Sequence, residues 1–314
     1  MKKLVVHVKM AALLVAGLGL SAAATGAQPA KKMGPAAVAE AERFVTDAEA
    51  LLRKLDFNYG RAEWVAQNFI SNDTEIMTAQ MGELRLTAAG ELALKARRYK
   101  GLKLPEATAR KLKLLQLSLM LSDAGERETY PRLAAGMTGA YGKAKYCPKS
   151  ADGTSGACMP LGEMEKVLAE SRDPARLKEI WLGWHAVSPA YKQPYADYVA
   201  LSNKGAREMG FADTGALWRS GYDMPPDAFA AEMERLWQQV KPLYDALHTY
   251  TRHKLRQTYG PDVVAADGPV PAHLFGNMWS QTWDNLYPML KPAGTKDDFD
   301  LGRALVAKKT VQLT

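Results

Sequence analysis

Hydrophobic residues recur at three- and four-residue spacing through most of the chain, which is the periodicity of amphipathic helices. Over 35–55, for example, valines, leucines and Phe44 fall on one stripe. Few stretches alternate hydrophobic and polar residues over more than four positions, and hairpin dipeptides flanked by such stretches do not occur. The pattern therefore predicts a mainly α fold.

Polar and helix-breaking residues mark where these helices start and stop. In the first third of the chain we expect one helix over 35–55 and a second over 60–70. A third is expected from Asn72, which stands three residues before Glu75 as in a capping box, to about Tyr99.

Three further helices are predicted to start at or next to a proline. Asp173-Pro174 and Ser188-Pro189 each place a capping residue before a proline at the first helical position. Pro105 opens another predicted helix, which should end near a Ser-Asp-Ala-Gly break.

The longest predicted helix runs from Pro226 to Tyr259. Gly260 follows it as a stop signal, and Pro242 inside it predicts a kink. The sequence shows no internal repeat and no long low-complexity linker, so we expect residues 28–314 to belong to a single domain.

The first 27 residues have the layout of a secretory signal peptide. Three lysines precede an apolar run from Met10 to Ala24, and small residues follow up to Ala27. A run of about 15 apolar residues is shorter than the roughly 20 that a membrane span needs. We expect residues 1–27 to be removed and the chain to be exported, periplasmic or secreted, without a stable membrane span. An uncleaved anchor is the alternative.

Composition agrees with a soluble globular protein, at 47% hydrophobic and 24% charged residues. The chain has 41 basic and 34 acidic residues, a net charge of +7. The signal segment holds three lysines and no acid, so its removal leaves 38 against 34, or +4. This excess is mild and no basic cluster is interleaved with aromatic residues, so no nucleic-acid partner is expected.

The two cysteines, Cys147 and Cys158, lie in a turn-rich stretch with Pro148, Gly153 and Gly156. In an oxidising compartment such a pair is expected to form one disulfide that closes a surface loop. A metal site is the weaker interpretation, because neither a second cysteine pair nor a nearby histidine completes four ligands.

Known catalytic motifs are missing from the 314 residues. His248 and His253 are five residues apart, whereas a helical zinc pair has four-residue spacing, as in H-E-x-x-H. No G-x-S-x-G elbow, P-loop or dinucleotide fingerprint occurs, and neither cysteine has the surroundings of a nucleophile. These residues alone indicate no more than an exported helical protein.

One aromatic stretch near the carboxyl end has two interpretations. It mixes Trp279 and Trp283 with Asn277, Gln281 and Thr282. Tryptophans at helical spacing usually belong to a core, whereas amide side chains between indoles also suit the wall of a peptide-binding cleft.

Five strings in the chain, occurring in family order, resemble the angiotensin-converting enzyme family of zinc peptidyl-dipeptidases. They are RAEWVAQNFISNDTE at 61–75, KEIWLGWH at 178–185, LWRSGYD at 217–223, KPLYDALHTYTRHKL at 241–255 and GPVPAHLFGNMWSQTWDNLY at 268–287. The resemblance implies a helical fold with a deep channel beneath amino-terminal lid helices. Residues 28–314 would form the lid and one wall of that fold, as the amino-terminal half of a bacterial member.

The resemblance also implies an activity, the removal of carboxy-terminal dipeptides from oligopeptides by a zinc-activated water. Gln281 matches the family glutamine that holds the terminal carboxylate of the substrate, and Thr282 and Trp279 would line the same substrate site. Tyr222 matches a tyrosine of a chloride site, which makes chloride a candidate ligand, whereas His185 stands where a second chloride site has an arginine. The two cysteines match the cysteine pair of the family.

The sequence departs from the family in one respect that bears on function. It contains no H-E-x-x-H motif, so it offers no metal ligands and no catalytic residue, although the family implies zinc. We therefore expect the chain to be incomplete and to be inactive alone. The alternative is a non-catalytic exported helical protein that binds peptides or another partner.

Overall fold

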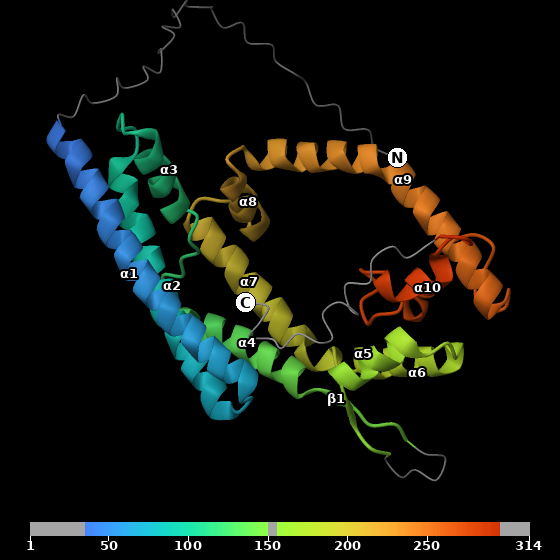
Figure 1. The fold of residues 1–314 in the computed structure, drawn as a ribbon. Coiled ribbons are helices and arrows are strands. Elements are labelled where there is room, and N and C mark those ends of the chain that lie inside the picture. The colour runs from blue at the N-terminus through green and yellow to red at the C-terminus, as the bar shows by residue number, and fades with distance from the viewer. Residues whose placement is uncertain (1–34, 150–155, 296–314) are drawn as a thin grey trace, which may run out of the picture.

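A computed structural model describes residues 35–149 and 156–295 (Figure 1). The predicted signal peptide, residues 1–27, lies outside the described residues. The described chain is mainly helical, with only two short strands, which confirms the predicted mainly α class. Its elements in order are α1 Pro35–Asn68, α2 Asn72–Ala96, η1 Arg97–Tyr99, α3 Glu106–Leu115, α4 Ala124–Lys143, β1 Lys145–Tyr146, β2 Met159–Pro160, α5 Leu161–Glu170, α6 Pro174–His185, α7 Pro189–Glu208, α8 Thr214–Arg219, η2 Ser220–Tyr222, α9 Pro226–Tyr259, η3 Ala272–Leu274, η4 Asp284–Leu286 and α10 Tyr287–Leu290.

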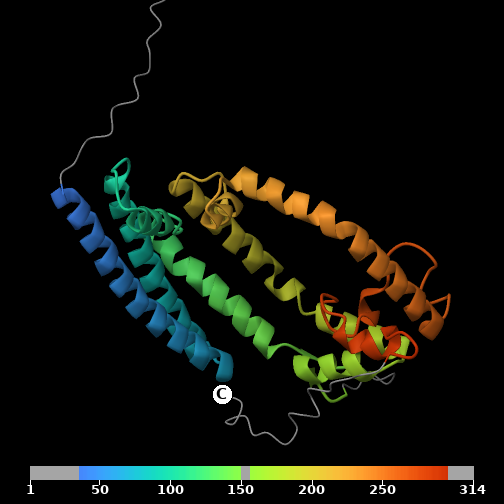
Figure 2. The ribbon, with the colours of Figure 1, turned by 45° about the horizontal axis from the view of Figure 1, so that its top comes forward.

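The long helices follow one another across the molecule. Helix α2 packs against α1 on one side and α4 on the other, and α4 packs in turn against α7. Figure 2 shows α1, α2, α4 and α7 side by side, with α9 beyond them. Helix α9 contacts α8 near one end and α10 near the other, so it bridges the two ends of the molecule.

Among the described residues, buried hydrophobic side chains form two cores. The first joins α1, α2, η1 and α3, and its buried residues are Ala41, Val45, Ala48, Leu92, Ala96, Tyr99, Leu112 and Leu115. The second lies where α5, α6 and the last turns of α9 meet the chain that follows α9. Its buried residues are Met164, Leu168, Leu177, Ile180, Trp184, Leu255, Val264, Val270, Leu274, Phe275, Met278 and Leu286.

Strands β1 and β2 form a short antiparallel pair that the predicted disulfide closes. Lys145 pairs with Pro160 and Tyr146 with Met159. Cys147 and Cys158 are the next residues along each strand and are joined by a disulfide, which confirms the predicted pairing.

Several predicted helix boundaries are confirmed. Asp173 caps α6, and its Oδ1 accepts a hydrogen bond from the Ala175 N–H at 2.9 Å. Helix α9 begins at Pro226 and ends before Gly260, which adopts the positive φ of 88° that favours glycine. Figure 1 shows that α9 bends along its length, in agreement with the kink predicted from its internal proline.

Other predicted boundaries were wrong. The helices expected over 35–55 and 60–70 are one continuous α1, since Gly60 is exposed and costs an exposed helix only about 1 kcal/mol. The cap of α2 is Ser71, whose hydroxyl accepts from the Thr74 N–H while the Thr74 hydroxyl accepts from the Ser71 N–H, and the predicted Asn72 lies inside the helix. Helix α3 ends at Leu115, earlier than expected.

Among the described helices, none combines the length and the apolar character that crossing a bilayer requires.

Candidate substrate-binding site

The three residues assigned to substrate binding by resemblance lie together on one loop. This loop, residues 275–283, connects η3 to η4 and is called the substrate loop below. Its Met278 is fully buried in the second core, whereas Trp279, Gln281 and Thr282 are exposed, Trp279 to 44%. The core thus holds the loop from beneath and leaves the three candidate side chains on its outer side.

Asn277 fixes the shape of the substrate loop. Its amide nitrogen donates hydrogen bonds to the Thr282 carbonyl and, at 2.9 Å, to the Thr282 hydroxyl. Its amide oxygen accepts from the Trp279 N–H, also at 2.9 Å. Both ends of this amide are therefore used within the loop, so Asn277 shapes the site and does not present its amide to a ligand.

Ser280 turns the chain between Trp279 and Gln281. It adopts a φ of 59°, a left-handed conformation that is uncommon for a residue with a Cβ. Two hydrogen bonds hold it there. The Ser280 hydroxyl donates to the Ala272 carbonyl at 2.9 Å, and the indole N–H of Trp283 donates to the Ser280 carbonyl at 3.1 Å.

The two tryptophans of the substrate loop have different environments. Trp283 is partly buried in an aromatic cluster with Phe275, His248 and Tyr244, with a ring-centroid distance of 5.0 Å to Phe275. Trp279 belongs to no such cluster among the described residues. The core interpretation therefore fits Trp283 but not the exposed Trp279, for which the cleft-wall interpretation stays a prediction.

A hollow lies beside this cluster. It has a volume of about 390 Å³ and is bounded by α9 and by Gly268 and Pro269. Tyr244 and His248 belong both to its wall and to the aromatic cluster. The Arg252 guanidinium donates to the Gly268 carbonyl at 2.8 Å and so ties α9 to the chain that leads into the substrate loop.

The carboxamide of Gln281 is the functional group that this loop leaves open. It forms no hydrogen bond with another described residue, so its N–H donors and its carbonyl face solvent. The Thr282 hydroxyl accepts from Asn277 and keeps its own O–H for donation. A neutral amide donor beside a hydroxyl donor and an exposed indole can bind a carboxylate next to an apolar side chain.

Tyr222 is not brought to the substrate loop. Its ring stacks on Phe229 with a centroid distance of 4.1 Å and is 61% exposed. It precedes the first turn of α9, whereas the substrate loop packs near the far end of that helix. At about 1.5 Å per residue, some 25 residues of α9 place the two positions roughly 40 Å apart along the helix. Its assignment to a chloride site rests on the resemblance.

His185 is engaged at the end of α6. Its Nδ1 lies 2.7 Å from the Trp181 carbonyl, and because a carbonyl can only accept, this nitrogen carries the proton. The imidazole also stacks on the Trp181 indole at 3.9 Å. This is a local contact of a histidine that ends a helix, and it gives an anion no permanent charge of the kind that arginine supplies.

The described residues do not fit a zinc site. Within 35–149 and 156–295, no three His, Cys, Asp or Glu side chains gather as they would around a metal ion. His248 lies among aromatic rings, and His253 is exposed on α9. No step of a metal-dependent reaction can therefore be assigned to these residues.

The fold defines a mainly α protein, and the loop exposes an amide, a hydroxyl and an indole on its surface. Comparison with known families identifies it more closely. The family model described as angiotensin-converting enzyme matches residues 35–313, and the chain belongs to that family, whose members are zinc metallopeptidases.

Individual relatives agree with this assignment. The chain is 42% identical over 184 residues to angiotensin-converting enzyme of Sus scrofa and 40% identical over 188 residues to that of Bos taurus. These matches cover 58% and 59% of this chain, but only 14% of each relative. The chain therefore matches a small part of these longer proteins.

Proposed function

We propose that this chain supplies the peptide-binding wall of a peptidyl-dipeptidase-like metallopeptidase, in which Gln281 binds the carboxylate at the carboxyl terminus of an oligopeptide. The observation that carries the proposal is the open carboxamide of Gln281 on a loop whose shape Asn277 and Ser280 fix. Membership of the angiotensin-converting enzyme family supports a peptide as the ligand.

The chemistry of the loop suits this role. The Gln281 amide N–H and the Thr282 O–H would each donate to a carboxylate oxygen, and hydrogen bonds to an ionised acceptor are roughly twice as strong as neutral ones. The exposed Trp279 ring would cover an apolar side chain of the peptide. Because Asn277 already holds the loop, little ordering entropy remains to oppose binding.

We propose also that the 314 residues do not hydrolyse peptides by themselves. Their sequence contains no H-E-x-x-H, and the described residues do not fit a zinc site. What these residues contribute is the binding and orientation of the peptide.

Export is part of the proposal. The basic, apolar and small-residue segments of residues 1–27 and the Cys147–Cys158 disulfide both suit an oxidising compartment outside the cytoplasm. Mass spectrometry of the protein recovered from a secreting host tests this, with an amino terminus at Gln28 as the expected result. A retained Met1 would contradict it.

Calorimetric titration of the 314-residue chain tests the binding role. The ligand is an N-blocked tripeptide with a free carboxyl terminus, and its carboxyl-terminal amide is the matched control. We expect the acid to bind about tenfold more tightly than the amide, because only the acid presents a charged acceptor.

Two glutamine variants complete that test. Gln281→Ala should remove the preference for the acid, whereas Gln80→Ala, which truncates an exposed glutamine of α2, a helix outside the core that holds the loop, should keep it. Equal affinity for acid and amide, or an unchanged preference in Gln281→Ala, would show that this residue does not bind the carboxylate.

A further inference from the structure

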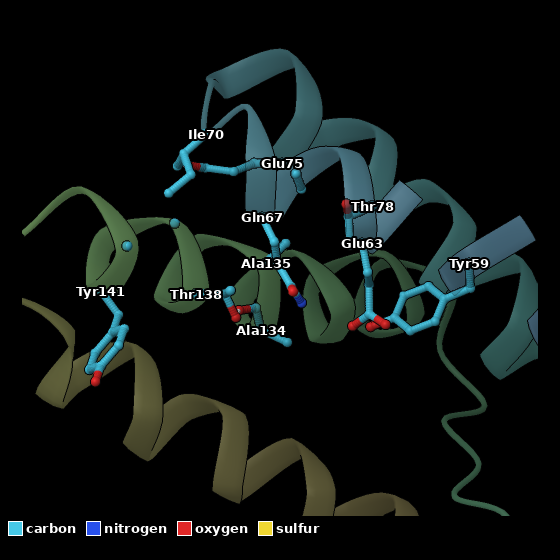
Figure 3. Close-up of a pocket in the computed structure, with 13 residues that line it drawn as sticks. Tyr59, Glu63, Gln67, Ile70, Glu75, Thr78, Ala134, Ala135, Thr138 and Tyr141 are labelled. Carbon is cyan, nitrogen blue, oxygen red and sulfur yellow. The ribbon is translucent and has the colours of Figure 1, made fainter. Parts of the chain in front are cut away.

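A second pocket lies between α1, α2 and α4 (Figure 3) and shares no residue with the substrate loop. Its volume is about 220 Å³. Small side chains form much of its wall, with Ala66 on α1 and Ala134, Ala135 and Gly139 on α4. Because these side chains are small and apolar, they leave space between the two long helices and give the pocket an apolar wall.

One end of the pocket carries a carboxylate that forms no ion pair among the described residues. Glu63 extends from α1 toward α4, and Figure 3 shows its carboxylate beside the Tyr59 ring. Burial and the hydrogen bond that the Tyr59 hydroxyl donates to Glu63 raise the pKa of Tyr59 to about 12, so this phenol stays protonated. None of the ion pairs between described residues includes Glu63; the nearby Arg85, whose charge acts to lower the pKa of Tyr59, pairs with Asp56.

The other end of the pocket is electrically balanced. Glu75 of α2 forms an ion pair with Lys143 of α4 at 2.5 Å, and its side chain is 20% exposed. No basic residue lines the pocket itself. The lining carboxylate that forms no ion pair therefore lies at the Tyr59–Glu63 end.

Two further polar groups lie between these ends. Figure 3 shows the Gln67 side chain extending from α1 into the space between Glu63 and Thr138. The amide oxygen of Gln67 is a hydrogen-bond acceptor, as is the hydroxyl of Thr138. A cationic donor at Glu63 would thus find additional acceptors close by.

We propose that this pocket binds a small primary ammonium ion that carries an aromatic ring. The ammonium would pair with Glu63 and contact the face of the Tyr59 ring, a favourable position for a cation. The aromatic ring would lie on the alanine wall of α4, formed by Ala134 and Ala135. The pocket volume is below the roughly 300–1,000 Å³ of sites for drug-sized ligands. The ligand should therefore be no larger than a single ring with a short alkyl chain.

The test uses 2-phenylethylammonium chloride as the probe and the uncharged 2-phenylethanol as its matched control. Each is titrated into the 314-residue chain in a calorimeter. We expect one saturable site for the amine and at least tenfold weaker binding of the alcohol. No saturable binding of the amine, or equal binding of the two probes, overturns the proposal.

Three variants locate the site. Glu63→Gln should weaken binding of the amine about tenfold or more. Glu42→Gln makes the same change of charge on the same helix, roughly 30 Å away at 1.5 Å per residue, and should leave binding unchanged. Ala134→Leu should fill the pocket and abolish binding while the circular dichroism spectrum stays helical. Wild-type affinity in Glu63→Gln or in correctly folded Ala134→Leu would place the probe elsewhere and refute the assignment.

Discussion

Gly139 of α4 packs against the Glu75 side chain of α2. We expect the effect of replacing this glycine on the free energy of unfolding to change sign when Glu75 is removed. A Cβ at position 139 would lie only 2.0 Å from the Glu75 Oε1 and 2.5 Å from its Cδ. Because the obstructing atoms are the end of a flexible side chain, Gly139→Ala would move the carboxylate without separating the helices. The displaced carboxylate would lose its ion pair with Lys143.

The magnitude follows from three contributions. Loss of a partly exposed ion pair costs about 0.2–1 kcal/mol. Crowding a packed interface costs about 1–3 kcal/mol. Replacing glycine by alanine inside a helix stabilises the folded state by about 0.5–1 kcal/mol. We therefore expect Gly139→Ala to lower the free energy of unfolding by about 1–2 kcal/mol in the wild-type background.

The same substitution should act in the opposite direction once the obstruction is gone. In a Glu75→Ala background, Gly139→Ala should raise the free energy of unfolding by about 0.5–1 kcal/mol, since only the helix-propensity gain remains. The coupling between the two positions should then be about 2 kcal/mol. Urea unfolding of the four proteins, followed by far-ultraviolet circular dichroism, measures it. An effect of Gly139→Ala that is the same in both backgrounds would refute the steric explanation.

Three other predictions concern the disulfide, a tyrosine and the substrate loop. Replacing Cys147 and Cys158 by serine should lower the free energy of unfolding by up to about 3 kcal/mol, the loop-closure entropy for a separation of 11, as measured in urea. Because the pKa of Tyr59 is raised to about 12, its contribution to stability is complete below pH 10 and is lost as the pH rises from 10 to 12. Glu63→Gln should lower that pKa, which phenolate absorbance reports. Asn277→Ala should leave far-ultraviolet circular dichroism unchanged but red-shift tryptophan emission as the loop loosens; an unchanged emission spectrum would contradict the role of Asn277.

The sequence predicted those helix ends that have a local chemical cause. Asp173 before a proline and Gly260 after a long periodic run are such cases, and both hold in the structure. The prediction placed a helix break at Gly60, but α1 continues through it. An exposed glycine inside a helix lowers stability by only about 1 kcal/mol, which the packing of α1 on both sides of it outweighs. Ser71 was missed because Thr74 completes its capping box, whereas the expected partner was a Glu or Gln.

Local sequence patterns predicted less of the candidate site than of the helix ends. Spacing alone did not separate Trp279 from Trp283, because their different burial depends on the turn at Ser280 and on the rings of α9. The role of Asn277 depends on a hydrogen-bonded loop that leaves no periodic signal. Gln281 was singled out by its resemblance to a family motif, and the structure adds the open carboxamide.

The central claim is that these 314 residues bind a peptide but do not cleave it. The most direct measurement is dipeptide release from an N-blocked tripeptide, with added zinc and with a chelator. It is made on the 314-residue chain and on the product of the complete reading frame that encodes it. We predict no release by the 314-residue chain under either condition, and chelator-sensitive release by a product that contains H-E-x-x-H. Chelator-sensitive release by the 314-residue chain would contradict the account.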